Sequence, residues 1–516
     1  MYQSILTGCL RGVEGDIVCA EVDVSTGLPG ISMVGSLSTE AREAKERVIV
    51  ALKNAGFEVP PNKITINLSP ADIRKEGTGF DLPIAVGLLA CLGFFDEKEC
   101  ESTSFVGELA LDGSVKPIHG ILPLVRTFAQ GKIKRCFVPQ GNAKEAGMIP
   151  GISIYGVSHI TELLAFLQAE EQEEREAILQ KEICSLPELL EHAEKEKTTD
   201  FADVKGQEVA KRAAQIAAAG FHNLLMSGPP GGGKSMIAKR IPGILPPLSV
   251  EEMLEVSTIY SVAGLLNEEK PLITQRPFQS PHHTISHGAL IGGGGRVRPG
   301  SISLSHRGVL FLDELTEFPR TVLECLRQPL EDRKVSIARV QSRYSFPADF
   351  MLVCAMNPCK CGYYPDLNRC TCTESDRKRY VGKISGPLLD RIDMCVQTHR
   401  VELESLSSVQ RGETSESMRR KVMVAREIQK ERFKDRNYLF NSEMPVEDIE
   451  EFCVKTKEAK AMLEQAYVVL SLSARTYHRT LKVARTIADL EESELITEKH
   501  VAEALSYRFT KGESNG

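Results

Sequence analysis

The sequence predicts an α/β protein in which a parallel sheet lies between an N-terminal α+β domain and a C-terminal helical domain. Three observations predict this fold class. Apolar, strand-like runs alternate with helical runs over residues 200–401, which is typical of a doubly wound parallel sheet. A glycine-rich loop follows the first of these apolar runs, and from residue 402 onward only helical periodicity continues. A chain of 516 residues is long enough for about two to four domains.

Residues 1–167 form the first predicted domain. The run STEAREAKERVIVALKNAGF has helical periodicity, with Ser38 and Gly56 as its capping residues, and it alternates with strand-like runs such as ITINL and RCFVP. The longest apolar run, residues 82–95, is shorter than the about 17–25 residues of a membrane span. We therefore expect a buried core helix and no membrane contact.

Residues 168–199 are acidic and polar and predict a helical linker, whereas residues 402–516 predict a helical domain at the end of the chain. No basic segment followed by an apolar core opens the sequence, so we expect no secretory signal and a cytoplasmic location. The net charge of −7 excludes a surface that is basic throughout. Any contact with nucleic acid must therefore come from a local basic patch.

The motif GPPGGGKS predicts a phosphate-binding loop, because it fits the pattern G-x-x-x-x-G-K-[ST] and follows the apolar run NLLM. In such a loop the backbone N–H groups surround phosphate oxygens. Lys234 would reach the β- and γ-phosphates of ATP, and Ser235 would ligate Mg²⁺. The predicted nucleotide-binding residues are Gly228, Pro229, Pro230, Gly231, Gly232, Gly233, Lys234, Ser235 and Asp313.

Two further apolar runs end in polar side chains suited to ATP hydrolysis. In GVLFLDEL, Asp313 and Glu314 follow a buried strand at its carboxyl end, where ligands bind in parallel sheets. We expect Asp313 to hold Mg²⁺ and Glu314 to orient the attacking water. In FMLVCAMN, Asn357 would contact the γ-phosphate or the water. In GPLLDRIDM, Arg391 follows a short helix and could reach a nucleotide held by a neighbouring subunit.

The stretch NPCKCGYYPDLNRCTC holds two Cys-x-Cys pairs, formed by Cys359, Cys361, Cys370 and Cys372. In a reducing compartment, such a cluster favours a structural Zn²⁺ site with four thiolate ligands. Free thiols or a labile disulfide are the alternatives. A zinc site here would brace the connection between Asn357 and Arg391.

From end to end the chain resembles the ComM/YifB family, within the magnesium-chelatase-like branch of the AAA+ ATPases. The motifs that carry the resemblance are GLPGISMVG, RKEGTGFDLPIA, GELALDG, RPFQSPHHTISHGALIGGG, RPGSISLSHRGVLFLDEL, MNPCKCGYY and LSARTYHRTLKVARTIADL. The resemblance implies that the helical domain is the AAA+ lid and that Arg475 is the second sensor arginine, with Arg479 as the alternative. It also implies a hexameric ring with ATP between subunits, and a ring helicase that promotes branch migration during integration of transforming DNA.

The first domain is similar to the proteolytic domain of Lon proteases, which use a Ser–Lys dyad. Aligned on the motifs, Gly79 stands at the position of the serine and Leu122 at the position of the lysine. We therefore expect an inactive domain that serves as a scaffold or binds a partner. Ser69, Lys75 and Lys116 are conceivable substitutes, but we interpret them as solvated side chains.

Two segments near the sheet are rich in arginine and predict DNA contacts. One follows the phosphate-loop helix, and the other, LEDRKVSIARVQSRYSFPADF, predicts a β-hairpin. In AAA+ rings of this branch such insertions point toward the central pore. The candidate phosphate contacts are Arg296, Arg298, Arg339 and Arg343. The alternative is that these arginines contact ATP or a neighbouring subunit. His282, His283 and His287 favour loop hydrogen bonds over metal ligation.

Three functions remain in competition. The first is an ATP-hydrolysing ring motor on branched or single-stranded DNA. The second is a chelatase-type motor that drives metal insertion into a porphyrin through partner subunits, and the Lon-like domain weighs against it. The third is a Lon-like peptidase or its inactive regulatory relative, and Gly79 and Leu122 oppose the active form.

Overall fold

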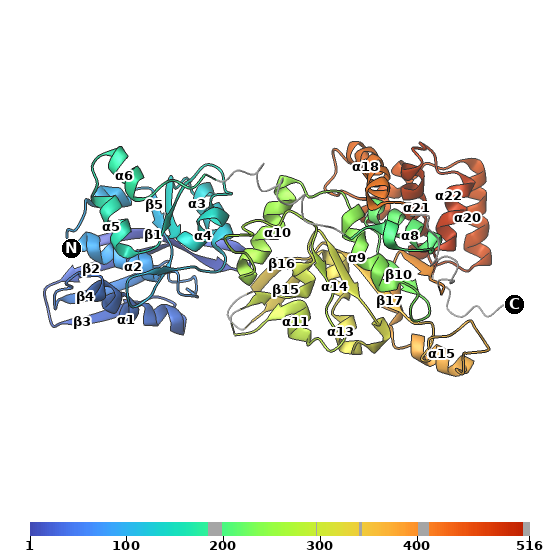
Figure 1. Ribbon diagram of the computed structural model, residues 1–516, viewed down its shortest axis with the longest axis horizontal. Helices are drawn as coiled ribbons and strands as arrows, with labels where there is room; N and C mark the ends of the chain where they lie inside the picture. The colour runs from blue at the N-terminus through green and yellow to red at the C-terminus, as the bar shows by residue number, and fades with distance from the viewer. Residues whose placement is uncertain (184–198, 296, 340–342, 401–411, 509–516) are drawn as a thin grey trace.

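The structure is a computed structural model that describes residues 1–183, 199–295, 297–339, 343–400 and 412–508 of the chain. Figure 1 shows three parts in succession along its long axis: a sheet domain at the N-terminus, a second sheet domain in the centre, and a group of helices at the far end. No helix among the described residues is both long enough and apolar enough to cross a membrane.

The N-terminal domain is built on a seven-stranded mixed sheet with the strand order β3-β4-β2-β1-β5-β8-β9. Its strands are β1 (Tyr2–Arg11), β2 (Glu14–Ser25), β3 (Gly30–Val34), β4 (Lys63–Ser69), β5 (Thr103–Phe105), β8 (Arg135–Pro139) and β9 (Ser153–Val157), and a small ribbon adds β6 (Glu108–Leu109) and β7 (Val115–Lys116). Its helices are α1 (Thr39–Asn54), α2 (Asp81–Cys91), α3 (Ile121–Gln130), α4 (Gln140–Ala146) and α5 (Ile160–Gln168), followed by α6 (Gln172–Ile178). Every residue of α2 is buried, so the longest apolar run forms a core helix as predicted.

The central domain contains a five-stranded sheet with the order β11-β14-β17-β10-β18, in which all neighbouring strands are parallel. Its strands are β10 (Leu224–Ser227), β11 (Phe278–Gln279), β14 (Val309–Leu312), β17 (Met351–Met356) and β18 (Met394–Gln397). Its helices are α8 (Glu208–Gly220), α9 (Lys234–Ile244), α10 (Val250–Ala263), α11 (His287–Ile291), α12 (Ser301–Leu304), α13 (Arg320–Glu324), α14 (Arg327–Asp332), α15 (Glu374–Val381) and α16 (Gly386–Leu389). Strands β14 and β17 are buried along their whole length, as their apolar sequences predict.

Two short ribbons project from the central domain. They are formed by β12 (Gly292–Gly293) with β13 (Arg298–Pro299), and by β15 (Lys334–Ala338) with β16 (Arg343–Pro347). The second ribbon is the predicted β-hairpin, with Val335 paired to Phe346. The ribbons touch each other, because Arg339 Nη1 donates to the carbonyl oxygen of Gly295 at 2.7 Å.

The helical domain packs on the α8 side of the central sheet. Its helices are α18 (Ser415–Arg432), α19 (Ile449–Phe452), α20 (Lys457–Val469), α21 (Ala474–Leu490) and α22 (Glu498–Ser506). Buried Met418 and Val422 of α18 share one hydrophobic core with Ala214 and Ala217 of α8. Burial of this apolar surface fixes the helices relative to the sheet.

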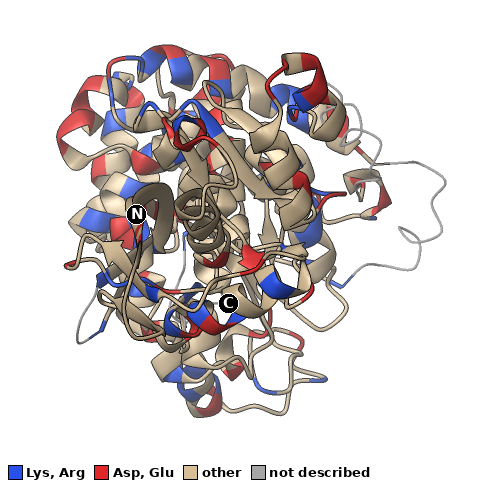
Figure 2. Cartoon of the chain, turned by 90° about the vertical axis from the view of Figure 1, so that its left-hand side faces the viewer, with Lys and Arg blue, Asp and Glu red and all other residues tan. Residues whose placement is uncertain are grey.

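The N-terminal domain docks onto α10 of the central domain through the start of α3 (Figure 1). The backbone N–H of Gly120 donates to the carbonyl oxygen of Ser261 at 3.0 Å, and that of Leu122 to the Ser261 hydroxyl at 3.4 Å. Leu254 of α10 packs against the core that contains Leu122. A second contact places Gly12 beside the hairpin, where a Cβ would lie 3.2 Å from the carbonyl oxygen of Ser345. Charges of both signs alternate over the outer face of the N-terminal domain (Figure 2).

A carboxyl group is buried at this interface. Asn142 Nδ2 donates to Glu145 Oε2 at 3.5 Å, while Glu145 Oε1 has no hydrogen-bond partner among the described residues. Burial raises the pKa of Glu145 to about 7, although Ser261 and Asn142 act to lower it. Because the pKa is higher in the folded protein, the stability that this group contributes is lost as the pH rises through about 7.

We therefore expect Glu145→Gln to remove part of the pH dependence of stability. A buried carboxyl that ionises near pH 7 should reduce the free energy of unfolding by about 1 kcal/mol between pH 6 and pH 8, and an amide cannot ionise. Urea unfolding of wild type and variant at both pH values measures this. Glu269→Gln, on an exposed loop, is the matched control. An unchanged pH dependence in Glu145→Gln would contradict the assignment.

Candidate functional site

The glycine-rich loop connects β10 to α9 and has the backbone conformation that phosphate binding requires. Gly231 and Gly233 each have a φ of 76°, in the left-handed region that favours glycine. At Gly228 the constraint is a close approach, because a Cβ would lie 2.1 Å from Thr398 Oγ1 and 2.3 Å from the Thr398 carbonyl oxygen. Thr398 directly follows β18, so the strand beside β10 fixes the base of the loop.

Lys234 is buried and its ammonium group is held by oxygen atoms. Its Nζ donates to the carbonyl oxygens of Gly228 at 2.6 Å and Pro229 at 3.0 Å, and to Asn357 Oδ1 at 3.3 Å. Burial lowers the pKa of Lys234, and the nearby charge of Asp313 raises it. The structure thus brings together Lys234 and Asn357, which were predicted from two different strands.

Asp313 and Ser235 also meet. The Ser235 hydroxyl donates to Asp313 Oδ2 at 2.6 Å. A hydroxyl beside a carboxylate is a pair of hard oxygen ligands suited to Mg²⁺. Glu314, the next residue, has a φ of 52° and is exposed, and its Oε2 lies 3.4 Å from His283 Nδ1. His283 comes from the histidine-rich segment, which therefore reaches the predicted catalytic carboxylate.

A large open cavity of about 2530 Å³ lies at the ends of β10 and β17, where Ser227 and Met356 line it. One part of its lining is the glycine-rich loop, and another is the segment around Lys205, Gln207 and His399. Tyr364 and Arg377, near the cysteine cluster, line a further part. The cavity is thus wide enough to hold a nucleotide whose phosphates contact the loop.

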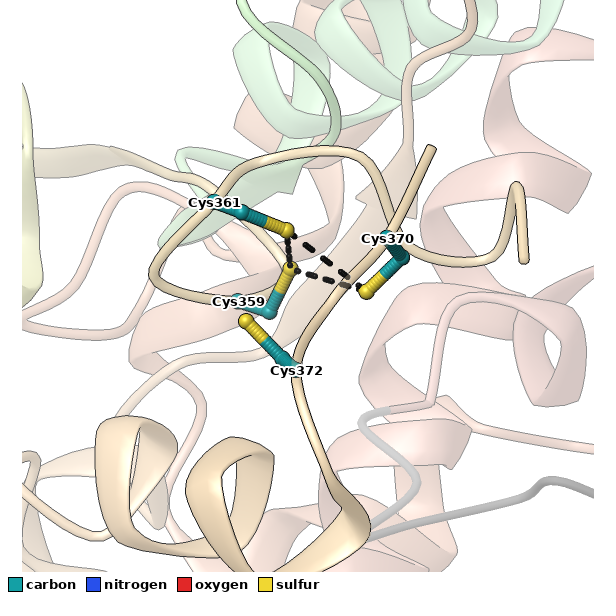
Figure 3. Close-up of side chains that lie close together, drawn as sticks. All are labelled: Cys359, Cys361, Cys370 and Cys372. Carbon is teal, nitrogen blue, oxygen red and sulfur yellow. Dashed lines mark hydrogen bonds between the residues drawn. The ribbon is translucent and has the colours of Figure 1, made fainter. Parts of the chain in front are cut away.

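The four cysteines converge, although they lie in two pairs along the chain (Figure 3). The Sγ atoms of Cys359 and Cys361 are 3.3 Å apart, and Cys370 Sγ lies 3.7 Å and 3.6 Å from them. All four sulfur atoms, including that of Cys372, lie within 4.8 Å of one another. Four sulfurs at about 2.3 Å from a tetrahedral Zn²⁺ would be about 3.8 Å apart. The cluster therefore fits one zinc ion.

The cysteine loop contacts the phosphate-binding loop directly. At Gly362, which has a φ of 81°, a Cβ would lie 2.8 Å from Pro230 Cδ and 3.8 Å from Asn357 Cγ. A side chain at this position would therefore displace the loop that binds phosphate. Arg377, at the helix that follows the cluster, lies 4.1 Å over the ring of Tyr364. The cluster thus braces the edge of the nucleotide cavity.

Arg391, predicted to reach a nucleotide of a neighbouring subunit, lies close to Arg475 and Arg479, the candidates for the second sensor. Arg391 and Arg475 both contact Glu331. Arg479 is mostly buried and donates to the carbonyl oxygens of Leu389 and Ile392. Arg479 therefore holds the backbone next to Arg391, whereas Arg475 is half-exposed.

The arginines predicted to contact DNA gather on the two ribbons. Arg298 lies on β13, and Arg343 on β16, and both are exposed. Arg339 lies at the turn of the hairpin, where it contacts Gly295. Arg296 lies outside the described residues. The described arginines therefore lie on two ribbons that touch each other through Arg339.

The Lon-like positions hold no dyad. Leu122 is fully buried in the core below α3, and a Cβ at Gly79 would meet Ile118 and Val106. Ser69 donates to Glu21 at 3.1 Å. Lys75 is buried and donates to the carbonyl oxygen of Pro70, so our interpretation of it as a solvated side chain was wrong. Burial lowers the pKa of Lys75.

Comparison with known proteins found relatives that match almost the whole chain. The uncharacterized protein YifB of Escherichia coli (strain K12) is 42% identical over 503 residues, which cover 97% of this chain and 96% of the relative. Competence protein ComM of Haemophilus influenzae is 42% identical over 500 residues, which cover 96% of this chain and 95% of the relative. The chain belongs to the ComM/YifB family.

Family descriptions of the magnesium chelatase match three parts of this ComM/YifB chain. "Magnesium chelatase, subunit ChlI" matches residues 200–406, "Subunit ChlI of Mg-chelatase" matches 20–142, and "Magnesium chelatase, subunit ChlI C-terminal" matches 412–508. The predicted fold class is confirmed. The family is one of AAA+ ATPases, so it implies ATP and Mg²⁺ as ligands, and proteins of this type form rings. Lon protease 2 of Bacillus subtilis is 29% identical over 168 residues, 31% of this chain and 30% of that protein.

Sequence reasoning missed Thr398, Gly362 and Glu331 at this ComM/YifB site, and it assigned His283 only to loop hydrogen bonds. Thr398 and Gly362 contact the phosphate loop, His283 contacts Glu314, and Glu331 holds two arginines. Thr398 has no motif of its own. Glu331 had one usable signal, since it precedes an arginine-rich hairpin, but its partners lie 60 and 144 positions further along the chain.

We expect Gly228→Ala to weaken ATP binding at least about tenfold, because the added methyl group would overlap the backbone of Thr398 and displace the loop. Titration of the purified protein with ATP measures the Kd. Gly243→Ala in α9 is the matched control, since its Cβ would have only the Thr199 carbonyl oxygen nearby, at 3.9 Å. Wild-type affinity in a folded Gly228→Ala protein would contradict the structure of this loop.

Proposed function

We propose that the chain is the subunit of a hexameric, cytoplasmic ATPase that acts as a motor on DNA and promotes branch migration. The observation that carries the proposal is the meeting of Lys234, Ser235, Asp313 and Asn357 at the carboxyl ends of three adjacent parallel strands. An ammonium group, a hydroxyl and a carboxylate at this edge are the groups that phosphate transfer from ATP requires.

Each residue then has a distinct role in hydrolysis. Lys234 binds the β- and γ-phosphates, which would replace the carbonyl oxygens that it contacts here. Ser235 and Asp313 would hold Mg²⁺, which neutralises phosphate charge when bound. Glu314 orients and deprotonates the attacking water, and Asn357 contacts the γ-phosphate. His283 lies close enough to hold the Glu314 carboxylate in place.

The DNA contact is proposed for the two ribbons. Arg298, Arg339 and Arg343 supply positive charge on a chain whose net charge is −7, and the contact between Arg339 and Gly295 joins the two ribbons. Clustered arginines without a base-reading motif favour contacts with the phosphate backbone. A relative that is 42% identical carries the name competence protein, which favours a DNA substrate over a porphyrin.

A second candidate is a chelatase-type motor, favoured by the match of residues 200–406 to the magnesium chelatase description. Both functions require ATP hydrolysis, so they differ only in what the motor acts on. Stimulation of ATP hydrolysis by DNA supports the first, and stimulation by partner chelatase subunits with a porphyrin supports the second. A peptidase is not proposed, because Gly79 and Leu122 supply neither nucleophile nor base.

We expect single-stranded and forked DNA to raise the ATPase rate of the assembled wild-type protein several-fold and the protein to displace strands or move a branch point. Glu314→Gln should bind ATP but lose turnover by about 10²-fold or more, because the amide cannot accept the water's proton. Coupled ATPase and strand-displacement assays measure both effects. An assembled wild-type protein that hydrolyses ATP without response to either DNA would remove the DNA-motor function.

The ribbons are tested in the same assays. Arg298→Ala combined with Arg339→Ala should weaken DNA binding equally for all sequences and reduce the salt dependence of log K by about 1 to 2 units. Arg420→Ala, an exposed arginine in the helical domain, is the control. Unchanged binding by the double variant would exclude the ribbons as the contact surface.

We also propose that the cysteine cluster holds a structural Zn²⁺ ion. The spacing of the sulfur atoms fits the donor set, and Cys359 is fully buried. Bound there, zinc would hold Gly362 against Pro230 and thus support the phosphate loop.

Freshly purified protein should therefore contain about one zinc ion per chain. Cys370→Ser with Cys372→Ser should lose the zinc and lower the affinity for ATP, because the cysteine loop would no longer support Pro230. Metal analysis and ATP titration are the measurements. Cys19→Ser, far from the cluster in the N-terminal sheet, is the control. Purified protein without zinc, together with unchanged ATP affinity of the double variant, would contradict the proposal.

A further inference from the structure

One carboxylate, that of Glu331, receives two arginines from different domains. Glu331 lies near the end of α14, with its side chain half-exposed. Arg391 Nη2, from the segment after α16, donates to Glu331 Oε1, and Arg475 Nη2, from the start of α21, donates to the same atom at 2.8 Å. The hydrogen bonds from Arg391 and then Arg475 hold the pKa of Glu331 below its usual range. The two guanidinium groups are therefore neighbours.

The described hydrogen bonds of the two arginines go to Glu331 and to the carbonyl oxygen of Pro387, and none of them reaches the phosphate loop. The cavity that the loop borders is lined by Pro387 and Leu389 beside Arg391. Inside that site Lys234 already has Asn357 as a partner. Among the described residues, the arginine pair thus has no hydrogen bond to its own phosphate loop.

The pair has capacity left for an anion. The Arg391 side chain is 9% exposed, its Nη1 donates to the carbonyl oxygen of Pro387, and its buried Nε has no hydrogen-bond partner among the described residues. Arg475 is half-exposed. One carboxylate between two guanidinium groups leaves one positive charge without compensation, and planar guanidinium groups suit phosphate oxygens. The two guanidinium groups are therefore suited to bind the oxygen atoms of a phosphate chain.

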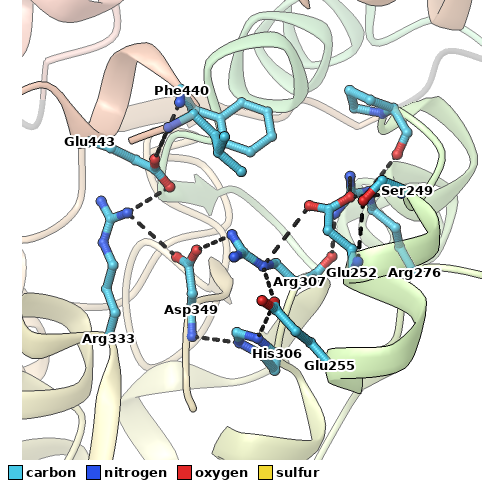
Figure 4. A network of polar contacts seen from close by, with 12 residues as sticks. Ser249, Glu252, Glu255, Arg276, His306, Arg307, Arg333, Asp349, Phe440 and Glu443 are labelled. Carbon is cyan, nitrogen blue, oxygen red and sulfur yellow. Dashed lines mark hydrogen bonds and ion pairs between the residues drawn. The ribbon is translucent and has the colours of Figure 1, made fainter. Parts of the chain in front are cut away.

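The end of α14 is itself held in place by both domains. Arg333, with a φ of 53°, contacts Glu443 of the helical domain at 2.6 Å and Asp349 of the central domain at 3.9 Å. Asp349 in turn accepts from Arg307 at 2.8 Å. Figure 4 shows this network, which continues through Glu255 to α10. Because these contacts fix the backbone next to Glu331, its carboxylate has a defined position.

We propose that Glu331 is a positioning residue for ATP hydrolysis: its carboxylate holds Arg391 and Arg475 side by side so that both face the phosphates bound by an adjacent copy of this chain. The inference rests on the proposed function, since it requires ATP hydrolysis within an assembly of identical subunits. Without this carboxylate, the two like charges repel each other and lose their common orientation.

The first test compares full-length Glu331→Gln, Glu331→Asp and the matched control Asp332→Asn, whose exposed side chain contacts Gln328. We expect Glu331→Gln to lower kcat about tenfold or more, with KM for ATP changed less than about twofold, because the phosphate loop is untouched. Glu331→Asp keeps the charge and should recover most of the rate. Asp332→Asn should hydrolyse ATP like wild type, and thermal unfolding confirms that all variants fold.

The second test asks whether Glu331 acts across the subunit boundary. Subunits carrying Glu314→Gln have intact arginines but an inactive site of their own. Subunits carrying Glu331→Gln have an intact site, but their arginines are no longer held in position. Mixed in equal amounts, they should regain up to about one quarter of the wild-type rate, because about one quarter of the neighbouring pairs combine an intact site with intact arginines. Each variant alone should stay impaired.

The failures can be told apart. A wild-type protein without ATPase activity would remove the proposed function and this inference with it. An active wild type whose Glu331→Gln variant keeps its kcat would overturn the inference alone. A loss of kcat that mixing with Glu314→Gln subunits does not relieve would also overturn it, since the arginines would then serve their own subunit. A loss of kcat that Glu331→Asp does not recover would exclude a role for the negative charge at position 331.

Discussion

The parallel pairing of β10, β14 and β17 is the constraint on which the site depends. Ser227 pairs with Met356, and Leu312 pairs with Cys354, so the three strands end at one edge of the sheet. The next residues along each strand therefore meet there, and Asn357 reaches Lys234 while Asp313 reaches Ser235. A shift of the pairing by one residue would turn these polar groups toward the apolar core. The buried, apolar sequences of β14 and β17 keep the strands in this register.

A second constraint is the close packing of the phosphate loop against its neighbours. Gly228 lies against Thr398, and Pro230 lies against Gly362, so the loop is held between the end of β18 and the cysteine loop. Neither neighbour contributes a charged group. Their effect is to remove alternative conformations of the loop, which leaves its N–H groups oriented toward one place before a nucleotide binds. Such preorganisation lowers the cost of binding.

The sequence was sufficient to predict site residues that lie within one short motif. The glycine pattern, the acidic pair after four apolar residues and the asparagine after the next strand could each be found within a few positions, and the hairpin over residues 334–347 followed from its own alternation. It was insufficient where contacts are long-range. Glu331 meets Arg475 across 144 positions, and Ser261 meets Leu122 across 139, because tertiary packing brings them together. Lys75 was misinterpreted for the same reason, since it is buried and its backbone pairs with Ser36 and Ser38, far earlier in the chain.

The interface between the first two domains holds the position that aligns with the catalytic lysine of Lon proteases. Leu122 occupies this position and is fully buried, and its backbone N–H donates to Ser261 of α10, so the position belongs to the docking surface. A lysine there would place a charged group in the apolar core that contains Leu122. The same helix carries Glu255, which joins the charge network through Arg307 to Asp349 and Arg333. The docking contact of Leu122 and the charge network that reaches Glu443 of the helical domain therefore share one helix, α10.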